Sequence, residues 1–144
     1  MADVFSKKKR SEVMARIRAS GTRIEDVLFR AVTGASGPRR RVIRNAKALP
    51  GHPDVVIPSL KVAIFADGCF YHGCPRHGRV PQSNVDYWLP KLQGNMTRDR
   101  RNRKMLRRRG YSVWRFWEHD LEGLRAVRTE KTIHRRLERA RLSP

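Results

Sequence analysis

The stretch ALPGHPDVVIPSLKVAIFADG, residues 48 to 68, contains two short apolar, β-branched runs that proline and glycine separate. The runs, residues 54 to 57 and 61 to 66, predict two strands, and Pro58 and Ser59 predict a tight turn between them. Because VAIF in the second run is continuously apolar, we expect a strand that is buried on both faces.

Two helices are predicted before these strands. Apolar residues at helical spacing begin at a plausible cap, Ser11, and Gly21 is expected to end the first helix. The second begins at Thr22, which forms a capping-box pattern with Glu25, and ends at Gly34.

Further elements lie on either side of the two strands. RRRVIRN, residues 39 to 45, is a candidate strand before them, and YSVWRFW, residues 111 to 117, reads as a buried strand after them. A long arginine-rich helix is predicted over residues 84 to 109, with Pro90 near its start or at a kink, and a basic helix over residues 129 to 141.

Strands clustered between helices, with a helix crossing to the last strand, predict an α/β domain whose mixed central β-sheet is flanked by helices on both sides. A chain of 144 residues fits one domain. Residues 1 to 10 end in KKKR and show no periodicity. We therefore expect a basic N-terminal arm over residues 1 to 10 and a single domain over residues 11 to 144.

The charge of the chain indicates a polyanionic partner. Lys and Arg number 33 against 13 Asp and Glu, a formal net charge of +20. Nucleic acid is the partner that such an excess favours, although charge alone does not separate RNA from DNA. No apolar run approaches the ~20 residues of a membrane span, and the N-terminus lacks the apolar stretch of a signal peptide. We expect a cytoplasmic protein with no membrane partner.

Cysteine and histidine residues form a candidate metal site. Cys69, Cys74 and His77 have C-x4-C-x2-H spacing in a loop after a predicted strand, and thiolate with imidazole is the donor set of tetrahedral zinc. His119, just past the last predicted strand, is a candidate fourth ligand. The alternative is that the cysteines are small buried hydrophobic residues and the histidines are solvated.

His72 and three acidic residues are candidates for catalysis. His72 would be a surplus fifth ligand, which leaves it available for acid–base chemistry. Asp54 opens one buried strand and Asp67 closes the next, where an unpaired carboxylate is costly unless it binds a cation or a hydrogen-bond donor. With Asp99 on the long helix, they suit a magnesium ion. The alternative for an aspartate at a strand end is a turn-forming role.

Five stretches together carry a resemblance to a known family: TRIE, LPGHPDVVI, VAIFADGCFYHGCPRHG, DYWLPKLQGNMTRDRRN and GYSVWRFWEHDL. They resemble the very-short-patch repair (Vsr) family of DNA mismatch endonucleases, within the restriction-endonuclease-like superfamily. The resemblance spans nearly the whole chain. It implies a restriction-endonuclease-like fold and an Mg²⁺-dependent enzyme that nicks double-stranded DNA 5′ to the mispaired thymine of a T·G mismatch.

The same resemblance implies roles for individual active-site residues. Asp54 matches the family's metal-binding aspartate, and the main-chain carbonyl of Ala66 matches a second magnesium ligand. His72 matches the general base, and Asp99 matches the helix aspartate that supports it. Glu25 matches a further active-site acid, a role that can coexist with helix capping.

Two positions depart from the best-known members. They have a cysteine where His119 stands, a change that preserves tetrahedral zinc coordination by Cys69, Cys74, His77 and His119. They also end the strand in Thr-His, where this chain has Ala66-Asp67. Asp67 cannot act as a cationic acid, so we expect it to ligate magnesium or to hold water.

The resemblance also implies DNA contacts. Phe70 and Tyr71 match an aromatic pair that wedges between bases, and Met14 matches an apolar residue that enters from the other groove. Lys91 and Asn95 match residues that read the mismatched pair. Because zinc ligands flank the aromatics, we expect at least one to project outward; the alternative is packing against the helix over residues 84 to 109.

The implied protein is a monomer of the bacterial cytoplasm, associated with the nucleoid, with mismatched double-stranded DNA as substrate and mismatch-repair proteins as candidate partners. Two alternatives stay open. One is a nuclease of the same superfamily that cuts another mismatch or a modified or specific duplex. The other is a non-catalytic zinc-containing module that binds nucleic acid, for which Asp54→Asn would change nothing.

Overall fold

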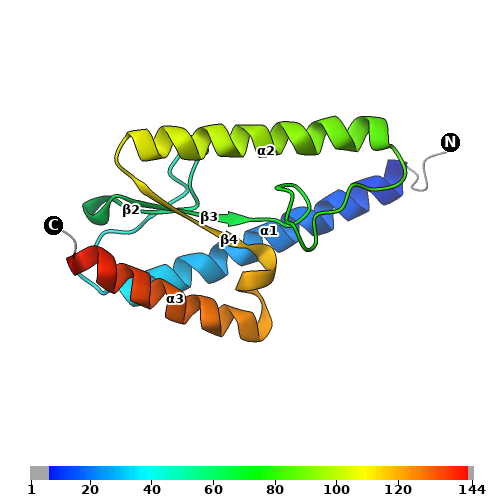
Figure 1. The fold of residues 1–144 in the computed structure, drawn as a ribbon. Coiled ribbons are helices and arrows are strands. Elements are labelled where there is room, and N and C mark those ends of the chain that lie inside the picture. The colour runs from blue at the N-terminus through cyan, green and yellow to red at the C-terminus, as the bar shows by residue number, and fades with distance from the viewer. Residues whose placement is uncertain (1–6, 143–144) are drawn as a thin grey trace.

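The computed structural model describes residues 7 to 142, and within the first helix the side chains of residue 12 and of residues 23 onward. Three long helices and four short strands make up this part of the chain, with three of the strands between the first two helices (Figure 1). In order, the elements are α1 (Lys7–Ser36), β1 (Ile43–Arg44), β2 (Val55–Ile57), η1 (Pro58–Leu60), β3 (Val62–Asp67), α2 (Val85–Arg108), β4 (Ser112–Trp117), η2 (Glu118–Leu121) and α3 (Gly123–Leu142).

The four strands form one mixed sheet in the order β1-β2-β3-β4. β2 pairs antiparallel with β1 and with β3, and the short connection through η1 suits the antiparallel β2–β3 pair. β3 pairs parallel with β4, with Asp67 opposite Trp117, and α2 provides the long crossover that a parallel pair requires. The carboxyl ends of β3 and β4 therefore meet at one edge of the sheet.

Helices cover both faces of the sheet: α2 lies on one side, and α1 and α3 lie on the other (Figure 1). Val62, Ile64 and Ala66 of β3 belong to the larger core, which includes residues of α1 and α3. Ala63 belongs to a smaller core with Leu106 of α2. Because side chains alternate along a strand, β3 is buried on both faces. The structure thus confirms the expected α/β fold, which is that of restriction-endonuclease-like proteins.

The first helix differs from the prediction. Gly21 does not end it: α1 is continuous from Lys7 to Ser36, so Thr22 lies inside the helix and not at its cap. Glycine within a helix costs about 1 kcal/mol relative to alanine, which a long helix with a buried stripe can tolerate. The end lies at Gly37, whose φ of +81° favours glycine, and not at Gly34.

Other boundaries shift as well. Residues 7 to 10 of the expected arm form the start of α1, while residues 1 to 6 lie outside the described part of the chain. Pro90 lies inside α2, close to its start, and α3 begins at Gly123, earlier than the predicted residue 129. Within residues 7 to 142, no helix has the length and apolar character needed to cross a membrane.

Candidate active site

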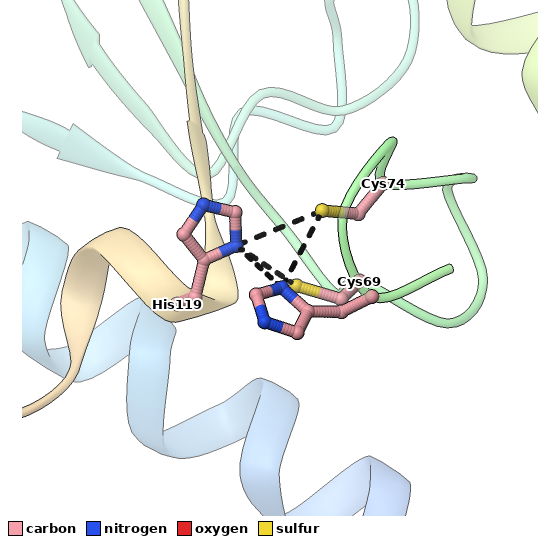
Figure 2. A group of neighbouring side chains, drawn as sticks. Cys69, Cys74 and His119 are labelled. Atoms are coloured by element: carbon pink, nitrogen blue, oxygen red, sulfur yellow. Dashed lines mark hydrogen bonds between the residues drawn. The ribbon is translucent and has the colours of Figure 1, made fainter. Parts of the chain in front are cut away.

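Parallel pairing of β3 with β4 brings two distant segments together. Residues 68 to 78 leave β3 as a loop, and η2 leaves β4 at the same edge. Asp67 and Trp117 are partners in the register of β3 with β4. Cys69 lies two residues beyond Asp67, and His119 lies two residues beyond Trp117. Figure 2 shows Cys69 and Cys74 from the loop and His119 from η2 with their side chains directed toward a common point.

Four donors surround that point. His119 Nδ1 lies 3.4 Å from Cys69 Sγ, 3.6 Å from Cys74 Sγ and 3.2 Å from His77 Nδ1, and Cys74 Sγ lies 3.8 Å from His77 Nδ1. A tetrahedral ion bound to sulfur at about 2.3 Å and to nitrogen at about 2.0 Å separates its donors by roughly 3.3 to 3.8 Å. The cluster therefore has the dimensions of a metal site.

The loop backbone is folded tightly around these ligands. Cys74 N–H donates to Cys69 O at 3.1 Å, and Gly78 N–H donates to Cys74 O at 2.8 Å. A Cβ at Gly78 would lie 2.5 Å from Cys74 N, so only glycine fits there. Cys69 N–H also donates to Glu118 Oε1 at 3.2 Å, which ties the loop to η2. The sequence interpretation missed Gly78 and Glu118; the glycine directly after His77 was the available signal.

Both cysteines are buried, unpaired thiols. The pKa of Cys69 is raised to about 11: burial is the largest cause, a backbone hydrogen bond at His119 opposes it, and the neighbouring Cys74 adds to it. At neutral pH this thiol keeps its proton unless a cation replaces it. Metal binding at this cluster would therefore release protons.

A second donor cluster lies beside the first. It contains Asp67 at the end of β3, His72 in the loop and Asp99 on α2. His72 Nδ1 donates to Asp99 Oδ2 at 2.6 Å and lies 3.8 Å from Asp67 Oδ1. Because Nδ1 is engaged, Nε2 is the ring atom available for proton transfer.

The acidic neighbours set the charge preference of His72. Burial acts to lower the pKa of His72, but the hydrogen bond with Asp99 and the negative charges of Asp67 and Asp99 more than offset it. The pKa therefore lies above its ordinary value, although Arg115 acts in the opposite sense. Such an imidazole is stabilised after it accepts a proton, as a general base requires.

Asp54 lies in a crowded acidic environment. Its Oδ2 accepts a hydrogen bond from Ala66 N–H at 2.7 Å, which joins the start of β2 to β3. The pKa of Asp54 is raised to about 7: burial is the largest cause, the hydrogen bond from Ala66 opposes it, and Glu25 of α1 and Asp67 add to it. A divalent cation would relieve this repulsion, so the oxygen donors present are compatible with a hard metal ion.

Arg115 of β4 is a site residue that the sequence interpretation missed. Its Nε donates to Asp67 Oδ2 at 2.5 Å, and its Nη2 donates to His72 O at 3.2 Å. Nη2 also lies 4.0 Å from Asp99 Oδ2. A charged residue inside the predicted buried strand YSVWRFW was the available signal.

The expected DNA-binding residues mostly gather between the loop and the first half of α2. Phe70 contacts Tyr71 and Trp88 edge-on, each at 5.1 Å between ring centroids. Asn95 Nδ2 donates to Tyr71 O at 3.2 Å, and Lys91 Nζ lies 5.6 Å from the centre of the Trp88 ring. Trp88 was not among the predicted residues.

The orientation of the aromatic pair is less simple than expected. Phe70 and Tyr71 are both half-buried, and Phe70 packs against α2, as the alternative interpretation held. The side chain of Met14 lies outside the described residues, so its place relative to this pair stays a prediction.

Comparisons with known proteins place the chain among DNA endonucleases. A family model described as DNA mismatch endonuclease Vsr matches residues 2–77. The DNA mismatch endonuclease Vsr of Escherichia coli (strain K12) is 37% identical over 142 residues, which cover 96% of this chain and 86% of that protein.

Nicking enzymes are related to a similar degree. The type II nicking enzyme V.XorIIP of Xanthomonas oryzae pv. oryzae is 39% identical over 129 residues, 88% of this chain and 92% of that protein. The type II nicking enzyme V.NaeI of Lentzea aerocolonigenes is 43% identical over 113 residues, 77% of this chain and 68% of that protein. Both a DNA mismatch endonuclease and type II nicking enzymes thus align with most of the chain.

Proposed function

The chain belongs to the Vsr family of DNA endonucleases, and we propose that it nicks double-stranded DNA 5′ to the mispaired thymine of a T·G mismatch. The observation that carries this proposal is the His72–Asp99 pair, placed beside the acidic residues Asp54 and Asp67 at one sheet edge. A base next to a group of oxygen donors is the equipment of metal-assisted phosphodiester hydrolysis.

His72 is the proposed general base. Its Nε2 takes a proton from the attacking water while Asp99 holds Nδ1 and stabilises the resulting imidazolium. The raised pKa of His72 supports this role, because the protonated form is favoured by its neighbours. Asp99 thereby acts as the orienting carboxylate.

Asp54 and the main-chain carbonyl of Ala66 are the proposed magnesium ligands. The high pKa of Asp54, about 7, supports a cation there because burial and nearby carboxylates disfavour its charge. When bound, magnesium would stabilise negative charge on the phosphate and on the leaving 3′ oxygen. Glu25 adds a further carboxylate close to Asp54.

Zinc is the proposed occupant of the Cys69, Cys74, His77 and His119 site. Two thiolates and two imidazoles at these distances are a donor set that zinc prefers. His72 lies between the first two ligands in the chain, so zinc would fix the loop that carries the base. The proposed role of zinc is therefore structural.

Mismatch recognition is assigned to the aromatic and polar residues beside that loop. Phe70 and Tyr71 are the proposed wedge, and Lys91 and Asn95 are proposed to read the mispaired bases. The hydrogen bond from Asn95 to Tyr71 O supports a shared surface. Met14 is proposed to enter from the opposite groove. Opening a mispaired step costs less than opening a matched one, which favours the mismatch.

The second candidate function is nicking at another mismatch or at a specific duplex sequence. The observation that favours it is the similarity to type II nicking enzymes, which are 39% and 43% identical to this chain, against 37% for the Escherichia coli protein. A non-catalytic zinc module is disfavoured because it has no need for the half-buried Asp54 beside the buried Asp67.

A panel of end-labelled duplexes tests these alternatives. The panel holds T·G, other mismatches and matched controls in several flanking sequences, each with Mg²⁺ and without. We expect a single nick, confined to the thymine strand and 5′ to the mispaired thymine, and dependent on Mg²⁺. Equal cutting of matched DNA would favour the sequence-specific enzyme, and no cutting of any duplex would favour the binding module.

We further propose that the enzyme acts as a monomer in the bacterial cytoplasm and that residues 11 to 144 form its nuclease domain. Mismatch-repair proteins are its proposed partners. A nicking rate that is first order in enzyme would support the monomer. The change in that rate when mismatch-repair proteins are added would measure their effect.

A further inference from the structure

We propose that Arg115 is a positioning residue of this active site, which holds Asp67 away from His72 so that Asp99 alone orients the imidazole. The inference rests on the proposed role of His72. It concerns a residue that neither the strand pattern nor the family resemblance assigned.

Two carboxylates compete for one ring nitrogen. Asp99 Oδ2 lies 2.6 Å from His72 Nδ1, whereas Asp67 Oδ1 lies 3.8 Å from the same atom. Asp67 is only 5% exposed, so water cannot replace a missing partner for its charge. Without the Arg115 guanidinium, a small movement would bring His72 Nδ1 within hydrogen-bond distance of Asp67 Oδ1.

Arg115 prevents this competition because its guanidinium nitrogens donate to two different groups. Nε holds Asp67 Oδ2 at 2.5 Å, and Nη2 holds the carbonyl oxygen of His72 at 3.2 Å. One guanidinium thus connects the end of β3 with the loop that carries the base. A lysine has the same charge but a single nitrogen, so it cannot reproduce both contacts in this geometry.

The guanidinium is itself held in place. Arg115 lies in β4 opposite Phe65 of β3, and its guanidinium carbon lies 4.0 Å from the centre of the Trp117 ring. Its side chain is 23% exposed. These contacts restrict the side chain before substrate binds, as a positioning role requires.

A different role is also chemically available to Arg115. It lines a hollow of about 580 Å³ between β4 and α3, together with four other arginines: Arg76, Arg125, Arg128 and Arg136. In that role it would bind a DNA phosphate and act on affinity. The two roles predict different kinetics, because positioning of His72 affects the chemical step.

The test measures single-turnover nicking rates at saturating enzyme, together with the Kd for uncut duplex. We expect Arg115→Met to slow the rate about 10- to 100-fold with Kd changed less than about twofold, and Arg115→Lys to fall between it and the wild type. In an Asp67→Asn background, where no buried charge needs holding, Arg115→Met should cost less than about threefold. The control is Arg108→Met, an exposed residue at the far end of α2, which should change neither quantity.

Three results would overturn the proposal: a weaker Kd with a shallower salt dependence and an unchanged rate, an equal penalty in the Asp67→Asn background, or a wild-type rate for Arg115→Met. Failure of the proposed function is separate, because it appears as no nicking by the wild type. If the wild type does not nick, a ¹⁵N spectrum of the His72 ring in the metal-replete, DNA-free protein still tests the positioning role of Arg115. Arg115→Met should shift the Nδ1 signal and Arg108→Met should not; an unchanged Nδ1 signal contradicts the proposal.

Discussion

The two donor clusters at the carboxyl edge of the sheet are close neighbours, but their side chains are arranged differently. The four residues of the first cluster converge on one point, with sulfur and nitrogen atoms 3.2 to 3.8 Å apart. In the second, Asp99 engages His72 and Arg115 engages Asp67, so its members are already paired. From this difference we expect the first cluster to depend on a bound ion for its shape, and the second to keep its shape without one.

The largest expected effect comes from breaking the first cluster. Cys74→Ser should lose most of the bound zinc, lower Tm by about 10 °C or more and abolish nicking, because distant ligands are joined only in the folded state. Elemental analysis and calorimetry measure these changes. Arg76→Ser, an exposed change in the same loop, is the control. A wild type that carries less than half an equivalent of zinc would refute the site.

Removing His72 of the second cluster, or the nearby Asp54, should remove activity and spare the fold. His72→Ala and Asp54→Asn should each slow nicking by about 10²- to 10⁴-fold, because the first removes the base and the second a metal ligand. Kd for mismatched duplex should stay within about threefold. His134→Ala, exposed on α3, is the matched control. Nicking at the wild-type rate by either variant would make the assigned roles wrong.

Without magnesium, Asp54 and its acidic neighbours should also make the free energy of unfolding depend on pH. The folded-state pKa of Asp54, about 7, lies above its ordinary value of 3.8, so the folded protein binds this proton more tightly than the unfolded chain does. The free energy of unfolding should therefore fall as pH rises from about 4 to about 7, by roughly 2 to 4 kcal/mol. Asp54→Asn should remove that part of the slope.

Urea unfolding in magnesium-free buffer without chelator, so that zinc is kept, measures this prediction. His72 also has a raised pKa and contributes a loss in the same direction. The difference between wild type and Asp54→Asn isolates the aspartate. Parallel pH profiles for the two proteins would contradict the crowded-acid interpretation.

The smallest expected effect concerns the aromatics between the clusters. Phe70→Ala and Tyr71→Ala should lower the preference for T·G over matched duplex by about three- to tenfold, since each removes part of a wedge. Their effect on salt-dependent, non-specific affinity should be smaller. Binding titrations at two salt concentrations measure both, with the exposed Leu124→Ala as control. If both variants fold and keep the preference, the pair only packs the loop against Trp88.

Much of the fold was determined by local sequence patterns. The runs around Val55–Ile57 and Val62–Asp67 and the stripe of α2 are short-range signals, and the structure confirms each element near its predicted bounds. Gly21 shows the limit of such signals: a glycine ends a helix only where the packing of the following residues does not continue it. The packing of α1 against α3 and the sheet decides that, and no local window contains it.

The candidate site divides in the same way. Three candidate metal ligands, Cys69, Cys74 and His77, lie within nine residues, so the sequence by itself determined most of the cluster. Tertiary structure decided that His119 completes it and that Arg115 reaches Asp67. Both depend on the parallel register of β3 with β4, which joins residues about fifty positions apart. Register is set by the packing of whole helices and strands, and it leaves no trace in the spacing of the residues that it brings together.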